Sequence, residues 1–380
     1  MSAEQHPDSS LHAWKKSALL RYSLAAVGLF VCFWSIWSAG RMGLSRMTAS
    51  YASAKNLMPA ADEAVNLGPS DPEAHYLRAS MLTSSGNLSE GIREYERAAA
   101  LRPLDYVLWM ALGSARDENG DTEGALLAFR EAVRQAPAYA EPHWQLGNVL
   151  LRANRPDEAF AEMRSAALSR PVLLPNFIDL VWSTAGEDAR EVERVIRPET
   201  DSWRLILARF FVKRGKAGEA LALYRAAGEA SEEERQALLK ELLAAKKFTE
   251  AYQVWKSVRE EKRNDSATEE AAAITDGGFE SGAKVNEPGF GWQLVSGNQM
   301  IRLSLDETEP AAGTKSLLLD WRGNVDAATP VLSQLVLVEA GARYRLHFTF
   351  RTKELSTGGP PVIVVSDAGG TSMELARSEP

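Results

Sequence analysis

The chain has 380 residues, which is enough for about two domains and a short additional segment. Its 51 Asp and Glu residues outnumber 43 Lys and Arg residues, and this acidic balance gives no electrostatic indication of nucleic-acid binding, so we expect no nucleic-acid partner. A single cysteine, Cys32, excludes a disulfide framework and a thiolate metal site.

An uncharged apolar run occupies residues 22–40, after an N-terminal tail of residues 1–21. At about 1.5 Å per residue, a helix of this length crosses most of the roughly 30 Å hydrocarbon core of a bilayer. We therefore expect a single-pass membrane protein with most of the chain exported to a periplasmic or other extracytoplasmic compartment. A cleaved signal peptide is the alternative, because Ser38 and Gly40 offer a weak cleavage site.

Three columns of residues recur with a period of 34 residues in the middle of the chain. They are Pro69, Pro103, Pro137 and Pro171; Ala64, Ala98, Ala132 and Ala166; and the turn residues Gly86, Gly120 and Asn154. A fixed period of this length is typical of stacked helix-turn-helix units. The small residues Gly113 and Ala125 allow the two helices of one unit to approach closely. Pro137 then ends that unit, because proline does not continue a helix.

The pattern resembles the tetratricopeptide repeat family. The signature residues of the unit 106–139 are Trp109, Leu112, Gly113, Ala125, Phe129, Ala132 and Pro137. The likeness is specific over residues 72–173, and looser units extend the predicted α-α solenoid to residues 50–262. His75 and His143 occupy the repeat position of Trp109, so packing explains them better than metal ligation.

The resemblance implies a concave groove lined by the first helix of each unit. The groove residues that it implies are Tyr76, Met110, Trp144, Asn148 and Leu151. Exposed aromatic and apolar side chains on such a surface favour a protein or peptide partner. The alternative is that these side chains pack against a neighbouring unit or the anchor helix.

A charged linker, residues 263–273, precedes a region rich in Gly, Pro and alternating apolar residues, 274–380. Its strand candidates are 299–305, 315–321, 331–338, 343–351 and 361–366. The clearest is 343–351, where Tyr344, Leu346, Phe348 and Phe350 have the period of a half-buried strand. Several short strands predict an antiparallel β-sandwich. We expect it to be abbreviated or cut short, because no final strand is evident before Pro380.

This region resembles a jelly-roll carbohydrate-binding module. The residues that carry the likeness are 276–280, Gly291, Trp292, 313–317, Gln334 and 341–344. The resemblance implies glycan binding and a structural calcium ion near the opening motif.

Asp276 and Glu280 are the calcium candidates, because calcium prefers oxygen ligands; solvated carboxylates are the alternative. Trp321 is the candidate for stacking on a sugar, with core packing as its alternative. Arg343, Arg345 and His347 would face an acidic glycan or simply water.

No catalytic motif is evident: the histidines lack zinc-site spacing, and neither a P-loop nor a Gly-x-Ser-x-Gly elbow is present. We therefore predict a protein that is not an enzyme and needs no cofactor beyond a structural calcium ion. The first hypothesis is an anchored scaffold for bacterial surface polysaccharide assembly or export. The second is an envelope assembly factor whose β domain binds protein. The third is a fragment of a larger enzyme whose catalytic part follows residue 380.

Overall fold

The computed structural model describes nine stretches of the chain. They are residues 9–228, 230–263, 273–280, 284–285, 288–294, 301–322, 330–354, 362–370 and 373–378. Residues 1–8 of the expected tail and 264–272 of the expected linker therefore lie outside the described residues. The chain divides into two units, 1–181 and 182–380, and each is described by itself.

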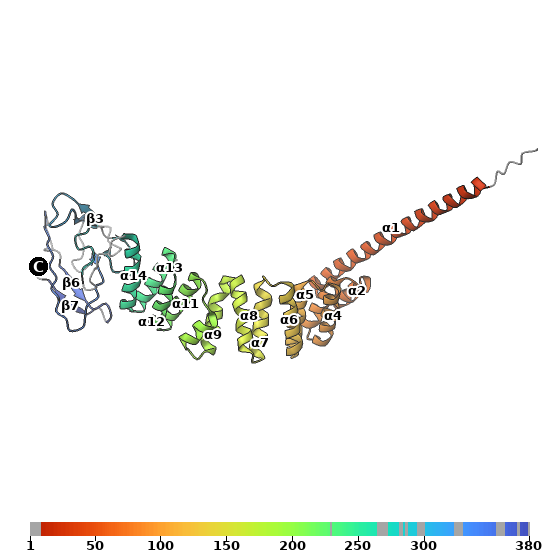
Figure 1. Cartoon of the computed structure of the whole chain (residues 1–380), viewed down its shortest axis with the longest axis horizontal. Coiled ribbons are helices and arrows are strands. Elements are labelled where there is room, and N and C mark those ends of the chain that lie inside the picture. The colour runs from red at the N-terminus through yellow and green to blue at the C-terminus, as the bar shows by residue number, and fades with distance from the viewer. Residues whose placement is uncertain are drawn as a thin grey trace, which may run out of the picture. The chain divides into compact units, whose positions relative to one another are not determined.

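The first unit is helical. Its elements are α1 Ser9–Lys55, α2 Met58–Leu67, α3 Pro72–Ser84, α4 Leu88–Leu101, α5 Tyr106–Glu118, α6 Thr122–Gln135, α7 Ala140–Arg152, α8 Pro156–Ser169 and the 3₁₀ turn η1 Pro171–Leu173. The pairs α3–α4, α5–α6 and α7–α8 form successive hairpins, and α5 to α8 lie side by side in Figure 1. Pro69, Pro103 and Pro137 fall between helices and Pro171 opens η1, as their 34-residue column predicts.

Local sequence sets where these helices begin and end. The Asp71 and Asp105 side chains accept hydrogen bonds from the backbone N–H of Glu73 and Val107, which caps α3 and α5. The turn column has a left-handed backbone, with φ of 85° at Gly86, 82° at Gly120 and 57° at Asn154. Glycine and asparagine adopt this conformation at low cost, so each hairpin turns at the same place.

Small residues set the close approach of the two helices within a hairpin. A Cβ added to Gly113 of α5 would lie 2.9 Å from the Phe129 ring of α6. A Cβ at Gly147 of α7 would lie 2.7 Å from Met163 of α8. The column that contains Ala79, Gly113 and Gly147 therefore has to remain small for the hairpins to pack as they do.

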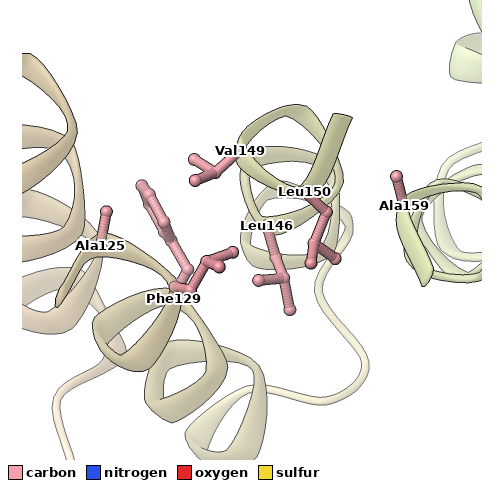
Figure 2. Packing of buried hydrophobic residues seen from close by; sticks show 7 residues of the cluster. Ala125, Phe129, Leu146, Val149, Leu150 and Ala159 are labelled. Atoms are coloured by element: carbon pink, nitrogen blue, oxygen red, sulfur yellow. The ribbon is translucent and has the colours of Figure 1, made fainter. Parts of the chain in front are cut away.

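Successive hairpins share a continuous apolar core, as Figure 2 shows for α6, α7 and α8. Its buried residues are Ala125, Leu126, Phe129, Leu146, Val149, Leu150 and Ala159. The Phe129 ring fills the space beside α7 and is only 1% exposed. Burial of such side chains between neighbouring hairpins is the main stabilising contribution to a stacked array.

The C-terminal part of α1 serves as the first helix of the opening hairpin, and its partner is α2. Ala49 and Ala52 are buried there, and Ser45 Oγ donates a 2.7 Å hydrogen bond to the Ala64 carbonyl. The guanidinium Nε of Arg46 lies 3.2 Å from Asp71 Oδ2. These contacts join the apolar helix directly to the repeats, without an intervening linker.

Residues 21–40 of α1 are exposed, and this part of the helix extends away from α2 in Figure 1. Within the part of the chain that the structure describes, one helical stretch, Arg21–Lys55, is long and apolar enough to cross a membrane. A membrane anchor and a signal sequence both meet that criterion. The expected span 22–40 lies inside this stretch.

The second unit begins with helices and continues with short strands, and its boundary with the first unit falls inside α9 Leu174–Thr184. The helices are α10 Ala189–Ile196, α11 Asp201–Lys213, α12 Ala217–Ala226, α13 Glu232–Ala244 and α14 Phe248–Arg263. Phe290 is 2% exposed and packs on α14, with its ring centroid 5.2 Å from Tyr252 and 5.7 Å from Trp255. The strand region is thus joined to the last helix by a buried aromatic cluster.

The strands form three small sheets. They are β1 Lys284–Val285, β2 Gln293–Leu294, β3 Ile301–Asp306, β4 Ser316–Trp321, β5 Leu332–Ser333, β6 Val364–Ser366 and β7 Glu374–Arg377. One sheet has the order β1-β2-β5, and the other two are the antiparallel pairs β3-β4 and β6-β7. In β3-β4 the register places Ile301 opposite Trp321.

The predicted β-sandwich is wrong for the described residues, which form these separate sheets instead. Segment 343–351 is extended but belongs to no ladder, and the candidate 331–338 shrinks to the two residues of β5. The expectation that no strand follows 361–366 is also wrong, because β7 pairs with β6. Alternation of side chains identifies an extended backbone, whereas a strand also needs a neighbour to exchange hydrogen bonds with.

Candidate partner-binding face

Three of the five expected groove residues contribute to packing within the helical array. The Tyr76 ring lies 5.7 Å from the Tyr95 ring, and Met110 and Leu151 pack against the buried cluster of Figure 2. All three side chains are half-buried. Part of their surface therefore stabilises the array, and the remainder is open to solvent.

Trp144 and Asn148 differ from these three. They lie one helical turn apart on α7, at positions i and i+4, and therefore share a face of that helix. Both are half-buried, yet among the described residues neither the indole N–H of Trp144 nor the side-chain amide of Asn148 has a hydrogen-bond partner. A peptide backbone offers the carbonyl and N–H groups that would satisfy both side chains.

The position of Trp144 recurs at 34-residue intervals along the first helices of the hairpins. Its members are Met42, Tyr76, Met110 and Trp144, which are all large and half-buried. Successive first helices of an array lie next to one another, so this column forms a stripe of apolar side chains. Such a stripe is a suitable contact surface for a partner, with Trp144 as its largest member.

A second column joins each first helix to the loop before it. His75 Nε2 lies 3.0 Å from the Pro69 carbonyl, and His143 Nε2 lies 3.0 Å from the Pro137 carbonyl. Trp109 Nε1 donates a 2.8 Å hydrogen bond to the Pro103 carbonyl in the same way. The prediction that these three residues occupy equivalent packing positions is confirmed, since each ring nitrogen satisfies the proline carbonyl six residues earlier.

The two histidines have acidic partners that the sequence alone did not reveal. His75 Nδ1 lies 2.5 Å from Glu94 Oε2, and His143 Nδ1 lies 2.5 Å from Glu162 Oε2. The sequence does contain an indication of these pairs, because each glutamate follows its histidine by 19 residues. The residue 19 positions after Trp109 is Ala128. Histidine and glutamate thus occur together in a unit, as do tryptophan and alanine.

Both neighbours of each imidazole are hydrogen-bond acceptors, and only the protonated ring can donate from both nitrogens, so this environment favours the protonated form. The hydrogen bond to Glu94 raises the pKa of His75 against the lowering effect of burial, and Glu162 raises the pKa of His143 in the same way. Burial would raise the pKa of Glu94, but the hydrogen bond from His75 and the nearby Arg78 and Arg97 lower it overall. These pairs are structural, because each one joins the two helices of its own hairpin.

The calcium candidates have protein partners. Glu280 Oε1 accepts hydrogen bonds from the backbone N–H of Thr314 at 2.7 Å and of Lys315 at 3.3 Å. The Thr314 hydroxyl, 2.5 Å from Glu280 Oε2, is the main cause of a lowered pKa for this carboxyl. Asp276 Oδ1 accepts from the Glu280 N–H at 2.8 Å. Glu280 therefore holds a turn, and no cluster of three or more metal-ligating His, Cys, Asp or Glu side chains occurs in the described stretches.

The glycan candidates are exposed but dispersed. Trp321 ends β4 with 39% of its surface exposed, and Arg343, Arg345 and His347 are exposed on the extended segment. Within the described ranges, no hydrogen bond or ring contact joins Trp321 to these three residues. Trp292, by contrast, stacks on Phe279 at 5.0 Å and donates to the Asp276 carbonyl, so it serves the local core.

Comparison with known families assigns part of the helical region. Residues 58–106 and 110–171 match the tetratricopeptide repeat family. This chain carries tetratricopeptide repeats. The matched residues contain α2 to α4, most of α5, α6 to α8, the two histidines His75 and His143 and all five groove residues. The match does not extend to α1, to α9 to α14 or to the strand region.

Solved structures that are similar to this chain have low sequence identity to it. The solved structure "Crystal structure of MamA" is 13% identical in sequence to this chain. The match covers 53% of this chain and 97% of the solved chain, with a TM-score of 0.32. "MamA 41-end from Desulfovibrio magneticus RS-1" is 15% identical with coverages of 49% and 92% and a TM-score of 0.32. "Functional Characterization of Pseudomonas Aeruginosa pilF" is 15% identical with coverages of 60% and 95% and a TM-score of 0.31. No curated protein matches the chain.

Proposed function

We propose that this chain is a membrane-anchored, non-enzymatic scaffold whose tetratricopeptide array binds a protein partner around Trp144 and Asn148. The observation that carries the proposal is the pair of half-buried side chains on α7, whose polar atoms have no hydrogen-bond partner in the described part of the chain and are open to solvent. A partner that covers these polar groups has to replace their hydrogen bonds to water, and a peptide backbone supplies both the carbonyl and the N–H group that this requires. Tyr76 and Met110 extend the same contact surface along the stripe, and Leu151 extends it along α7.

The anchor is the second part of the proposal. Residues 21–40 are exposed and apolar, and α1 continues without a break into the packed hairpin with α2. An uncleaved α1 that crosses the membrane with the array exported is consistent with both features.

A differential pull-down tests the partner-binding face. The full chain, solubilised from membranes with detergent, is compared with a Trp144→Glu and Asn148→Ala double variant and with Leu127→Glu. Leu127 is a matched control, because it is 63% exposed on the second helix α6 and outside the stripe. We expect partners that bind to the wild type and to Leu127→Glu and are lost from the double variant.

If the double variant retains every protein that the wild type retains, the face around Trp144 is not the binding surface. Circular dichroism of all three proteins checks that the helices are intact. Reporter fusions at Ser2 and after Arg263 test the anchor, and a cytoplasmic signal from the second fusion would contradict an exported array.

For the strand region we propose the second of the hypotheses, a protein-interaction module in envelope assembly. The favouring observation is the extended segment 343–351, which has no ladder partner among the described residues. Polysaccharide assembly or export has no corresponding observation, because Trp321 and the basic residues form no common site. Retention of the chain on a polysaccharide column, lost on Trp321→Ala, would restore the glycan hypothesis.

A further inference from the structure

The segment from Ala342 to Phe350 has a strand conformation without a strand environment. Its side chains alternate, and the Phe348 and Phe350 rings stack at 5.7 Å on one face. Among the described residues, no backbone hydrogen bond links residues 343–350 to another segment. An unpaired row of N–H and C=O groups is a template for a further strand.

Both faces of this segment are accessible. The aromatic face holds Tyr344, Leu346, Phe348 and Phe350, which are between 41% and 49% exposed. Such a continuous exposed apolar row is uncommon in a soluble region and indicates an interaction surface. The opposite face carries Arg343, Arg345 and His347, for which the described residues offer no ion-pair partner.

Charge decides what kind of strand fits. The next basic residue on that face, Arg351, forms an ion pair with Glu309. In an antiparallel pair of this segment with a second copy of itself centred on His347, Arg343 would lie opposite Arg351, and like charges across strands are destabilising. A strand that alternates acidic and apolar residues instead places carboxylates opposite Arg343 and Arg345.

We propose that residues 342–350 bind an extended segment of a partner protein by β-strand addition, and that this segment alternates apolar and acidic side chains. Main-chain hydrogen bonds supply the affinity, the aromatic row receives the apolar side chains, and the arginines select the acidic ones. This inference rests on the interaction role proposed above for the strand region, and it uses residues of the second unit, whereas Trp144 belongs to the first.

The test uses fluorescence anisotropy with the detergent-solubilised full chain. The probe is a labelled peptide of about ten residues that alternates Val and Glu, and the control peptide has the same composition in two blocks. We expect only the alternating peptide to bind. The Arg343→Glu and Arg345→Glu double variant should weaken binding about tenfold, because two attractive cross-strand pairs become repulsive.

A Lys240→Glu and Arg302→Glu double variant is the matched control. It makes the same charge change at exposed positions elsewhere in the second unit and should leave binding unchanged. Two further peptides, N-methylated either at all Val or at all Glu nitrogens, report on backbone pairing. Because an added strand presents one alternate set of N–H groups, one of these peptides should lose binding and the other should keep it.

The proposal is overturned if the block peptide binds as well as the alternating one, or if both N-methylated peptides bind equally. Absence of binding by the alternating peptide also overturns it. Self-association of the chain in sedimentation, lost on Phe348→Glu, would assign the surface to a second copy instead.

Discussion

The ion pair of His143 with Glu162 makes the stability of its hairpin depend on pH. His143 Nδ1 is 2.5 Å from Glu162 Oε2, and Nε2 is 3.0 Å from the Pro137 carbonyl. Since folding raises the pKa of His143, the protonated imidazole stabilises the folded state, and this contribution is fully present below the pKa of the unfolded chain, about 6.5. It is lost as the pH rises through the folded pKa. His75 and Glu94 repeat this arrangement two units earlier.

Glu162→Gln is the perturbation that isolates the charge. A hydrogen bond to a charged group contributes about 1.5–3 kcal/mol and a neutral one about 0.5–1.5 kcal/mol, so the variant should lose about 1 kcal/mol of unfolding free energy at pH 5.5. At pH 8.5 the loss should be smaller, because the imidazole is closer to neutral. The neighbouring hairpin has Trp109 and Ala128 in place of the pair and should show no such dependence.

Histidine NMR is the direct assay, because the chain has only five histidines to assign. We expect His143 to titrate above the ordinary range in the wild type and lower in Glu162→Gln, with His75 unchanged. Hydrogen exchange of α7 and α8 at pH 5.5 and 8.5 then measures the stability change. A Glu162→Gln effect that is equal at both pH values, or larger at pH 8.5, would show that His143 is neutral in the folded chain.

Three further predictions concern stability and packing. Asp71→Ala removes both the cap of α3 and the acceptor for Arg46, so thermal denaturation should report a loss of about 2 kcal/mol. Asp105→Ala is the control, because it removes the equivalent cap of α5 but no contact with α1, and it should cost about 1 kcal/mol. If Asp71→Ala and Asp105→Ala lose the same stability, Asp71 does not help to join α1 to the repeats. Gly113→Ala should cost about 1–3 kcal/mol, because the added Cβ meets the Phe129 ring. Gly218→Ala is the control: its added Cβ has no atom within 4 Å, so in the same thermal melts it should be neutral or stabilising by up to about 1 kcal/mol. Phe290→Ala should increase hydrogen exchange in α14, and unchanged protection would show that the aromatic cluster does not hold the strand region to this helix.

The sequence determined the helical array because its information is local and repeated. The prolines at 34-residue intervals, the left-handed turn residues and the small residue at Gly113 each specify a feature of one hairpin. Repetition then specifies the stacking, since each hairpin meets only its neighbours. The position of the long apolar helix followed from hydropathy in the same way.

Tertiary structure decided which polar side chains are satisfied and which are free. The partners of His75 and His143 come from the second helix of the hairpin, and only the packed geometry shows that Trp144 and Asn148 lack such partners among the described residues. In the strand region, alternation correctly indicated an extended backbone at 343–351 and wrongly indicated its burial. Pairing and burial depend on which segment lies alongside, and the period of one strand carries no information about its neighbour.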